Sequence, residues 1–528
     1  MTTQTEIERK YDVDESTPLP DLSGIAVVRP AGEAHLEAEY FDTERGDLAA
    51  SRIVLRRRRG GADEGWHIKL PAVEGRTELH WPLTDEDAPP SDAVDRVRAR
   101  VRGRDLAVIA RLRTHRTLVH LVAKDGAKDG AKDGSADGPE GGFEDGAALV
   151  EFADDVVSAT DATTGILRIW REWEVELLDG APDDPRERTA LLDAVEERLL
   201  AVGAVPSASK SKLAAALGRT DLDEGAASKP DPAGLDDSSP AAEVLLVAVA
   251  ALVDDLARID PLVRADEPDA VHQLRTRIRR LRSLFASYPT VFDRRVTDPL
   301  RDRLQAIGTV LGEARDAEVM RDRAASLLDE YEPVSDDVDE RLHEALARQY
   351  VAAHARAIDE LSGAGWFALL DDLDEFVAWP ALADDAMKPA ADVVPRALRK
   401  DLRRVRKRAK AADRADSDDD RMLLLHDVRK AAKRLRYAAE AVSQGDAAVF
   451  GKRIRKLAAN AEAVHDLLGE HRDSVLMQQH LRRSAGAGMG AGAGPGAHAF
   501  DYGVLHEVER HGAALCLADY PAALKALG

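Results

Sequence analysis

Glu6-Ile7-Glu8-Arg9-Lys10, close to the N-terminus, is the stretch that decides the fold of the first half of this chain. Its charged residues Glu6, Glu8 and Lys10 are two positions apart, and side chains two apart share one face of a β-strand. The same alternation recurs in short segments separated by Gly, Pro or Asp turns. These segments predict strands at residues 5–13, 53–58, 66–70, 77–83, 111–122, 148–153 and 170–178. Their spacing predicts a sandwich or a barrel, followed by a helix at 185–202 and a closing segment at 209–217.

Charged side chains share one face in several of the predicted strands. The further sets are Arg56 and Arg58; His67 and Lys69; Arg76, Glu78 and His80; and Glu172, Glu174 and Glu176. A solvated surface would explain any single set, but the opposite faces are apolar or aromatic, as at Leu55, Ile68 and Trp173. The combination predicts a charged interior, which is tolerable only if opposite charges pair or ligands and metals complete them. Arginine and lysine suit phosphate oxygens, and grouped carboxylates suit Mg²⁺ or Mn²⁺.

Bulk composition restricts the class of protein. A length of 528 residues predicts two or more domains. The net charge of −23 taken alone argues against a nucleic-acid partner, although strongly basic segments keep other anionic partners open. The single cysteine, Cys516, fits a reducing compartment. No signal peptide is evident, and the longest apolar run, 244–253, is about half of the ~20 residues that span a bilayer. We therefore expect a soluble cytoplasmic protein without a membrane segment.

The chain divides into regions of different composition. Residues 219–239 are rich in Asp, Ser, Gly and Pro, which predicts a linker between a domain at 1–218 and one at 240–528. The second region has apolar residues at helical spacing almost throughout. Within the first region, 124–146 consists largely of repeated Lys-Asp-Gly-Ala units and predicts a mobile loop between two strands. The sequence does not predict the oligomeric state.

An internal repeat runs through the helical region. His272-Gln-Leu-Arg-Thr-Arg-Ile-Arg-Arg-Leu-Arg282 matches His426-Asp-Val-Arg-Lys-Ala-Ala-Lys-Arg-Leu-Arg436, and Leu311-Gly-Glu-Ala-Arg-Asp316 matches Leu468-Gly-Glu-His-Arg-Asp473. Two matches in the same order predict a duplicated helical bundle. In each copy a stripe of basic residues falls on one helix face, namely His272, Arg275, Arg279 and Arg282, and His426, Arg429, Lys433 and Arg436.

This stripe has two readings. It is either a solvated basic face neutralised by nearby acids or an anion site shared by the two copies. A further basic helix is predicted at 396–410, and it lacks the interleaved aromatic residues that stack on bases. A flexible polyanion without bases fits the pattern better than nucleic acid, because closely spaced phosphates require only positive charge.

The first region resembles the CYTH superfamily, also called triphosphate tunnel metalloenzymes. The resemblance rests on Glu6-x-Glu8-x-Lys10 and on further motifs in the family's order: Tyr40-Phe-Asp-Thr43, Leu55-Arg-Arg-Arg58, Trp66-His-Ile-Lys-Leu-Pro71, Arg76-x-Glu78, Leu149-Val-Glu-Phe-Ala-Asp154, Glu174-x-Glu176 and Ser209-Lys210. It covers about residues 1–218 and implies an eight-stranded antiparallel tunnel that acts on triphosphates with Mg²⁺ or Mn²⁺.

The resemblance also implies roles for individual residues. Glu6, Glu8 and Lys10 are the expected catalytic residues, and the expected metal ligands are Glu6, Glu8, Glu174 and Glu176. The expected phosphate-binding residues are Arg56, Arg58, Lys69, Arg76, Arg113, Arg116 and Lys210. Arg113 and Arg116 have opposite parity, so both point inward only if a bulge lies between them. The roles of Glu151 and Asp154 stay open between metal binding and structure.

The second region resembles the CHAD domain over about residues 240–520. That resemblance implies two four-helix bundles related by pseudo-symmetry, with a basic groove that binds inorganic polyphosphate. The groove residues would be the two stripes named above, with His272 and His426 either as hydrogen-bond donors or as packing residues. Arg315-Asp316 and Arg472-Asp473 are equally well explained as ion pairs that hold helices together.

The function expected from both resemblances is hydrolysis of inorganic tripolyphosphate to pyrophosphate and phosphate, with a helical domain that binds polyphosphate. Three alternatives stay open: hydrolysis of thiamine triphosphate or a nucleoside triphosphate, cyclisation of ATP, and a non-catalytic polyphosphate-binding scaffold. The sequence has no GxxxxGK[ST] loop and no convincing Ser/His/Asp or Cys/His set. Direct attack by water is therefore the expected chemistry.

Overall fold

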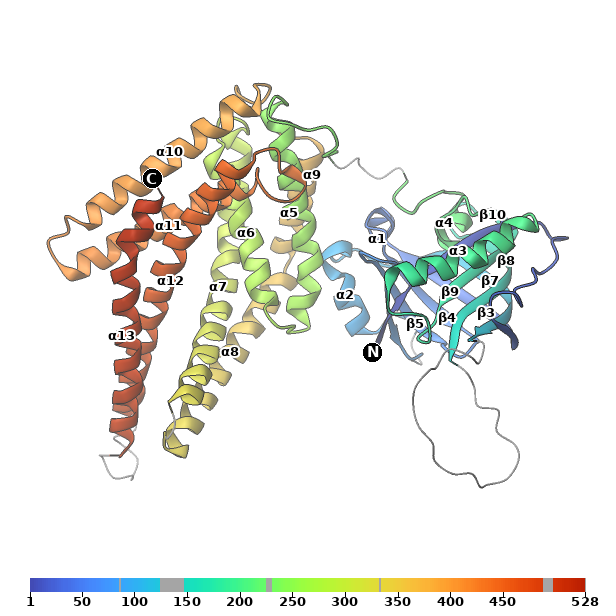
Figure 1. The fold of residues 1–528 in the computed structure, drawn as a ribbon, viewed down its shortest axis with the longest axis horizontal. Coiled ribbons are helices and arrows are strands. Elements are labelled where there is room, and N and C mark those ends of the chain that lie inside the picture. The colour runs from blue at the N-terminus through green and yellow to red at the C-terminus, as the bar shows by residue number, and fades with distance from the viewer. Residues whose placement is uncertain (85–86, 124–146, 225–229, 332–333, 488–496, 528) are drawn as a thin grey trace. The chain divides into compact units, whose positions relative to one another are not determined.

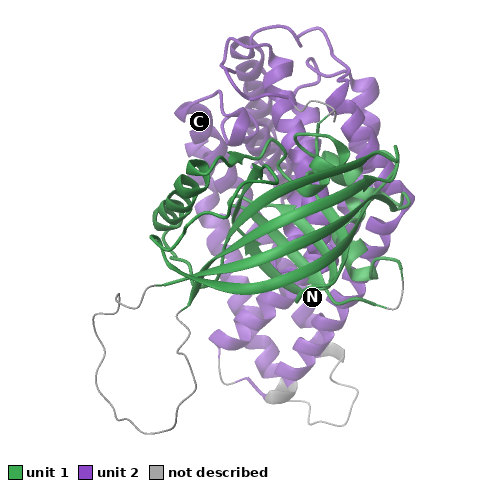
Figure 2. Cartoon of the chain, turned by 90° about the vertical axis from the view of Figure 1, so that its right-hand side faces the viewer, with its two compact units in different colours: residues 1–226 green, residues 227–528 purple. Residues whose placement is uncertain are grey.

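The structure is a computed structural model that describes the chain apart from residues 85–86, 124–146, 225–229, 332–333, 488–496 and 528 (Figure 1). It divides into two compact units, Met1–Ala226 and Ala227–Gly528 (Figure 2). The predicted loop at 124–146 lies outside the described residues. Among the helices that are described, none has the length and apolar character needed to cross a bilayer.

Unit 1 is built on one antiparallel sheet of ten strands in the order β1-β6-β5-β4-β3-β7-β8-β9-β2-β10. The strands are β1 (Thr2–Glu6), β2 (Glu8–Val13), β3 (Val27–Asp42), β4 (Val54–Arg59), β5 (Gly65–Pro71), β6 (Arg76–Trp81), β7 (Ala107–Val122), β8 (Ala148–Asp161), β9 (Leu167–Leu177) and β10 (Val205–Pro206). The antiparallel sheet confirms the coarse prediction, but the count of eight strands and the closed barrel were wrong. The first strand is interrupted at Ile7 into β1 and β2, and the two-residue β10 is an additional edge.

Because the strand is interrupted at Ile7, the N-terminal segment pairs with two different strands of the sheet. β1 pairs with β6, whereas β2 pairs with β9. Ile7 itself keeps a hydrogen bond, since its carbonyl accepts from the N–H of Leu177 at 3.0 Å. The N-terminal segment therefore pairs with both sides of the curved sheet, β1 forming one edge and β2 lying beside the other edge strand, β10.

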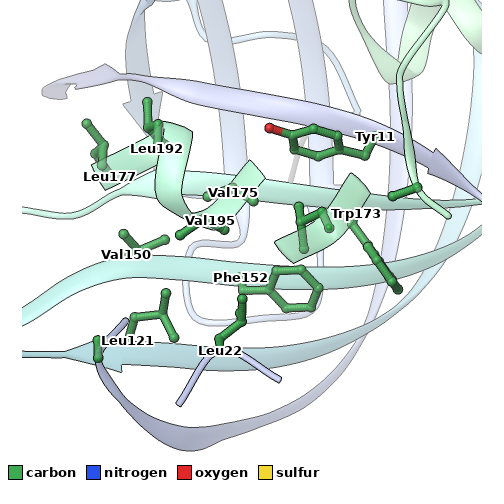
Figure 3. Packing of buried hydrophobic residues seen from close by; sticks show 13 residues of the cluster. Tyr11, Leu22, Leu121, Val150, Phe152, Trp173, Val175, Leu177, Leu192 and Val195 are labelled. Carbon is green, nitrogen blue, oxygen red and sulfur yellow. The ribbon is translucent and has the colours of Figure 1, made fainter. Parts of the chain in front are cut away.

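The apolar cores of unit 1 lie largely on the outer face of the sheet. Helix α3 (Pro185–Ala201) places Leu192, Val195 and Leu199 against Trp173 and Val175 of β9 (Figure 3). Helix α2 (Ser91–Val101) packs in the same way over the outward residues of β4, β5 and β6, which are Leu55, Trp66, Ile68, Leu79 and Trp81. Because side chains alternate along a strand, these contacts direct the charged residues into the interior.

Two short helices complete unit 1. α1 (Asp47–Ala50) follows β3, and Asp42 accepts hydrogen bonds from the N–H groups of Leu48 and Ala49 at 2.9 Å each. α4 (Lys212–Leu217) begins after Ser211, whose hydroxyl accepts from the N–H of Ala214 at 3.1 Å. The apolar face of α4 packs against inward-facing residues of β3, β7 and β8, among them Tyr40, Leu112 and Val157. α4 thus lies at one end of the interior.

Unit 2 is helical, as the sequence predicted. Its helices are α5 (Ala241–Arg264), α6 (Ala270–Ser287), α7 (Arg294–Glu330), α8 (Asp336–Ser362), α9 (Ala364–Ala378), α10 (Ala390–Ala412), α11 (Asp418–Glu440), η1 (Gly445–Ala447), α12 (Lys452–Ala487) and α13 (Ala497–Ala526). Consecutive helices pack within two runs of four, α5 to α8 and α10 to α13. The runs meet in pairs: α5 contacts α10, α6 contacts α11, α7 contacts α12 and α8 contacts α13. The two matched sequence motifs lie on α6 and α7 in the first run and on α11 and α12 in the second.

Candidate active site and anion-binding groove

The curved sheet encloses a cavity of about 320 Å³. Strands β1 to β9 all contribute side chains to its lining, and α4 contributes from one end. The cationic residues of the lining are Lys10, Arg56, Arg58, Lys69, Arg76, Arg116 and Lys212. Its carboxylates are Glu6, Glu8, Asp63, Glu151, Glu174 and Glu176. The structure therefore brings together residues that are far apart in the sequence into one charged chamber.

One charge cluster surrounds Glu78 on β6. Nδ1 of the buried His67 lies 2.7 Å from Glu78 Oε1, and Arg56 Nη2 lies 3.2 Å from the same oxygen. Lys69 Nζ lies 2.6 Å from Glu6 Oε2 and 3.7 Å from Glu78 Oε2. Burial and a hydrogen bond with Glu78 raise the pKa of Glu6 to about 7, against the opposing effect of Lys69. Burial lowers the pKa of His67 to about 4. Glu6 is thus a carboxyl group that can change protonation near neutral pH.

A second cluster surrounds the side chain of Lys212, the first residue of α4. Its Nζ lies 2.9 Å from Asp155 Oδ2, 2.6 Å from Glu172 Oε1 and 2.5 Å from Glu174 Oε1. Arg116 binds Asp155 through two nitrogens, at 2.8 and 2.7 Å. Although burial opposes ionisation, Lys212 and Arg116 hold the pKa of Asp155 well below its usual range. Asp155 and Glu172 have lowered pKa values and are ionised, and all three carboxylates are paired with cations of the chain.

Between the two clusters, three carboxylates form a row across neighbouring strands. Glu8 on β2 is the register partner of Glu176 on β9, which in turn is the partner of Glu151 on β8. All three line the cavity. Burial, together with the charges of Glu8 and Glu151, raises the pKa of Glu176 above its usual value, despite the attraction of Lys69. Although burial opposes ionisation, Lys10, whose Nζ lies 3.2 Å from Glu8 Oε2, holds the pKa of Glu8 well below its usual range, so Glu176 is the member of the row with a raised pKa.

Two carboxylate sets were compared as sites for a divalent cation. Asp155, Glu172 and Glu174 offer oxygen atoms within 4.8 Å of one another, but Lys212 already lies among them. Glu8 and Glu176 offer the oxygen ligands that Mg²⁺ and Mn²⁺ prefer. The raised pKa of Glu176 shows that this location favours added positive charge. Among the described residues only the set around Lys212 gathers three such oxygen atoms within 4.8 Å, whereas in the row of Glu8, Glu151 and Glu176 only Glu8 pairs with a lysine, Lys10.

On the opposite wall, arginine side chains offer hydrogen-bond donors to the cavity. Nε of Arg56 and Nε of Arg58 are buried and have no hydrogen-bond partner within the part of the chain that the structure describes. Burial and the charges of Arg56 and Arg116 lower the pKa of Arg58 to about 9. Buried donors without acceptors are rare and costly. A bound anion with several oxygen atoms would satisfy them.

Ten of the predicted active-site residues line the cavity, and two do not. The ten are Glu6, Glu8, Lys10, Arg56, Arg58, Lys69, Arg76, Arg116, Glu174 and Glu176. Arg113 is on the outer face, 81% exposed and paired with Glu37, because the register of β7 on β8 has no bulge between Arg111 and Arg116. Lys210 is 64% exposed, is paired with Asp221 at 2.6 Å, and lines an adjoining pocket that Glu6, Glu8, Lys10 and Arg76 also line. Neither Arg113 nor Lys210 lines the enclosed cavity.

Asp154, whose role the sequence left open, has a structural contact. It accepts hydrogen bonds from Arg171 at 2.8 Å and from the indole N–H of Trp173 at 3.1 Å, on the outer face. Its neighbour Asp155 is the residue that points inward. Asp155 lies an even number of positions from Glu151, and Glu172 lies two positions from Glu174, so each pair shares one face of its strand. Strand alternation alone was therefore sufficient to find Asp155 and Glu172. No such pattern identified Lys212, because Ser209-Lys210 and Ser211-Lys212 follow one another and the motif does not distinguish their lysines.

Unit 2 has a separate groove of about 490 Å³ between α6, α7, α11 and α12. Six of the eight predicted stripe residues line it: His272, Arg275, Arg279, Arg282, Arg429 and Lys433. Arg315, Lys430, His465 and Arg472 add to the lining, whereas its carboxylates are Asp316 and Asp473. The groove therefore carries a large excess of positive charge.

Several of these cations have an unsatisfied hydrogen-bond donor. Nε of Arg279, of Arg282 and of Arg429 is buried without a hydrogen-bond partner among the described residues. Burial and the neighbouring arginines, chiefly Arg279 and Arg429, lower the pKa of Lys433 to about 5. Burial likewise lowers the pKa of His272 to about 4. Such depression is the electrostatic sign of cations held together without anions.

Two of the stripe residues, His426 and Arg436, do not line the groove. His426 is exposed and does not line the groove, although burial of part of its ring and nearby cations lower its pKa. Arg436 is paired with Glu440 at 2.7 Å and with Glu462 at 2.6 Å. Neither residue lines the groove, and for Arg436 the reason is that the second copy of the motif has acidic neighbours, Glu440 and Glu462, at this position. Asp316, by contrast, joins the copies, since it lies 3.3 Å from both Arg275 and Arg472.

Comparisons with known proteins agree with this two-part organisation. Residues 4–200 match the family model of the CYTH domain, and residues 247–482 match that of the CHAD domain. Over 553 residues the chain is 37% identical to the uncharacterized protein MT2285 of Mycobacterium tuberculosis (strain CDC 1551 / Oshkosh), covering 99% of this chain and 96% of that protein.

Solved structures also resemble the chain in part. PptA from Streptomyces chartreusis is 19% identical with a TM-score of 0.45, covering 54% of this chain and 100% of that one. The CHAD domain from the plant Ricinus communis is 23% identical with a TM-score of 0.39, covering 57% of this chain and 95% of that one.

Proposed function

This chain belongs to the family of proteins in which a CYTH domain is followed by a CHAD domain, and from that premise we propose that its first unit is a metal-dependent inorganic triphosphatase. The observation that carries the proposal is the cavity wall formed by Arg56 and Arg58, whose buried Nε atoms lack acceptors among the described residues, facing the carboxylates Glu8 and Glu176, of which Glu176 has a raised pKa. An anion with several negative charges, together with a divalent cation, would satisfy both walls at once.

The cationic residues would bind the phosphate chain. Arg56 and Arg58 lie on β4 and Arg76 lies on β6, on the other side of β5, while Lys10 lies on β2 and Arg116 on β7. Guanidinium groups grip phosphate oxygens with paired donors and so fix the chain along the cavity. Neutralising the charge that accumulates on phosphate oxygens is the main task of a phosphoryl-transfer site.

The carboxylates would divide two tasks. Glu8 and Glu176, with Glu151, are the proposed ligands of Mg²⁺ or Mn²⁺, because Glu174 is engaged by Lys10, Arg116 and Lys212. When bound, such a cation supplies charge neutralisation and lowers the pKa of a coordinated water. Glu6, held by Lys69 at 2.6 Å, is the proposed acceptor of the proton released by the attacking water. The carboxylates also argue against a purely anion-binding scaffold, since an anion alone gains nothing from them.

The test measures phosphate release from tripolyphosphate, ATP and thiamine triphosphate, each with Mg²⁺, with Mn²⁺ and with a chelator. We expect metal-dependent release from tripolyphosphate, and its loss in Glu6→Ala and Glu8→Ala. Turnover of ATP or thiamine triphosphate that is faster than that of tripolyphosphate would show that the substrate is an organic triphosphate. Formation of cyclic AMP would identify a cyclase. Metal-dependent turnover of none of the three would reject the enzymatic proposal.

For the second unit we propose binding of inorganic polyphosphate in the groove between α6, α7, α11 and α12. The supporting observation is the set of buried, unpartnered guanidinium nitrogens on Arg279, Arg282 and Arg429. The test is salt-sensitive binding of long-chain polyphosphate, which should weaken strongly in the double variant Arg275→Ala, Arg429→Ala. Unchanged affinity in that variant would reject the groove as the binding site.

A further inference from the structure

Each of the two Leu-Gly-Glu motifs places a helical glycine directly opposite a groove arginine. Gly312 lies on α7 facing Arg275 of α6, and Gly469 lies on α12 facing Arg429 of α11. Both glycines are buried. The same relationship therefore occurs once in each run of four helices, at matching positions of the repeat.

The contact leaves no room for a side chain. A Cβ atom at Gly312 would lie 3.2 Å from Nη2, 3.5 Å from Nε and 3.6 Å from Cζ of Arg275. A Cβ atom at Gly469 would lie 3.3 Å from both Nε and Nη2 of Arg429 and 3.8 Å from Cζ. At both positions Cζ is the farthest of the three atoms, so the Nε–Nη2 edge of the guanidinium lies against the glycine. Contacts of a Cβ atom shorter than 3.4 Å are rare in proteins, so an added methyl group would require the arginine to shift by a few tenths of an ångström.

Close packing of two helix backbones does not explain these glycines. At both positions, the atoms nearest to an added Cβ belong to the arginine side chain and none belongs to the backbone of the facing helix. Glycine inside a helix is destabilising relative to alanine, because it loses more conformational freedom on folding. Two glycines at equivalent helical positions therefore need a reason other than stability of the fold.

One helical turn after each glycine the motif supplies an aspartate. Asp316 Oδ1 lies 3.3 Å from Arg275 Nη1. The equivalent Asp473 is the largest electrostatic attraction acting on Arg429. Glycine and aspartate four residues apart share one helix face. The motif thus provides space for the edge of the guanidinium and a partial counter-charge beside it.

We propose that Gly312 and Gly469 are positioning residues of the groove, each leaving the space in which the Nε–Nη2 edge of a guanidinium packs against the helix, so that the arginine is held ready for a bound phosphate chain. The proposal rests on the proposed polyphosphate binding and specifies how the groove prepares for it. Holding the arginines before binding reduces the conformational entropy that binding must remove. The absence of a side chain at the glycine, and not an additional hydrogen bond, positions the arginine.

The experiment compares Gly312→Ala and Gly469→Ala with the unaltered full chain, using long-chain inorganic polyphosphate as the probe. Each variant should bind about tenfold more weakly, the value of roughly one charge-assisted hydrogen bond. The thermal unfolding temperature should stay the same or rise, because alanine is the better helix former. A glycine with a merely structural role predicts the reverse pattern, a lower unfolding temperature and unchanged affinity. That pattern in both variants would overturn the proposal.

Two control variants separate this effect from general crowding. Gly308→Ala, also on α7, would place its Cβ 3.3 Å from a methyl group of Ile278 instead of an arginine. Gly503→Ala on α13 would meet nothing within 4 Å. Both should retain the affinity of the unaltered chain. Loss of binding in Gly308→Ala equal to that in Gly312→Ala would show that displacement of the helix, not of Arg275, is responsible.

A double-mutant cycle identifies the partner of each glycine. Arg275→Ala should add little to Gly312→Ala, since both act through the same guanidinium, whereas Arg429→Ala should add its full effect. Full additivity of Gly312→Ala with Arg275→Ala would overturn the proposal. If the unaltered chain does not bind polyphosphate at all, the proposed function of the groove fails with it. Normal binding of the unaltered chain with normal binding of both glycine variants rejects the positioning role alone.

Discussion

The Nζ atom of Lys212 lies 2.6 Å from Oε1 of Glu172, so that the first residue of α4 is bound to β9 inside the cavity. Lys210, two residues earlier, points outside and pairs with Asp221. The exposed fraction of the two side chains is 12% for Lys212 and 64% for Lys210. Two lysines in nearly the same sequence surroundings therefore have different roles, which makes them a matched pair for mutation.

Replacement of Lys212 by alanine should lower kcat/KM for tripolyphosphate by about hundredfold, as expected when one preorganised cationic donor is lost. The free energy of unfolding should also fall by about 3 kcal/mol, because Asp155, Glu172 and Glu174 lose a shared counter-ion. Lys210→Ala is the control and should leave both quantities nearly unchanged. Phosphate release and chemical denaturation measure the two effects. Equal losses in both variants would contradict the assignment of Lys212 to the cavity.

Arg116 and Arg113 form a second matched pair, three residues apart on β7. Arg116 binds Asp155 and Glu174 inside, whereas Arg113 pairs with Glu37 outside. Arg116→Ala should raise KM for tripolyphosphate by about tenfold or more, since a charged hydrogen-bond donor is removed. Arg113→Ala should leave KM unchanged. Steady-state kinetics at constant Mg²⁺ distinguish the two, and a raised KM in Arg113→Ala would show that the register of β7 differs from that described.

Glu176→Gln should increase the Mg²⁺ concentration required for half-maximal activity by about tenfold or more, because a charged ligand becomes a neutral amide. Removal of divalent metal by a chelator should abolish activity in the unaltered chain. Asp154→Asn is the matched control: it weakens the contacts with Arg171 and Trp173 on the outer face and should lower stability without altering the Mg²⁺ requirement. An unchanged Mg²⁺ titration in Glu176→Gln would remove this residue from the metal site.

Polyphosphate binding in the groove should take up protons. The pKa of Lys433 is about 5 in the free protein, depressed by burial and by Arg279, Arg429, Arg275 and Arg436, so the group is neutral at pH 7. A bound anion favours the charged form and raises this pKa. Binding near pH 7 should therefore absorb about one proton at Lys433, and affinity should fall as pH rises from 6 to 8, by up to about tenfold per pH unit.

Titration calorimetry in buffers of different ionisation enthalpy measures that proton uptake directly. Lys433→Met should remove most of the pH dependence while retaining binding through the arginines. Proton release on binding by the unaltered chain, or an affinity that rises with pH, would contradict the expected direction.

Much of the interior of unit 1 could be derived from strand alternation. Glu6, Glu8 and Lys10 share one parity, and the structure places all three in the lining. The same reasoning succeeded on β5 and β9, where a charged face alternates with a largely apolar one. It failed to find β3 (Val27–Asp42), because Pro30 and Gly32 and a run of small and acidic residues obscure the alternation. Helix α2 was missed as well, although it covers the outer face of three strands.

The sequence by itself determined the charged parity of the strands, the helical second half and the order of the repeated motifs, because these depend on spacing along one segment. Only the tertiary structure decided which of two lysines enters the cavity, that Arg113 stays outside, and that Arg436 is neutralised by Glu440 and Glu462. The physical reason is that strand register, partner exchange at Ile7 and the electrostatics of buried groups depend on neighbours far away in the chain. No local pattern contains those neighbours.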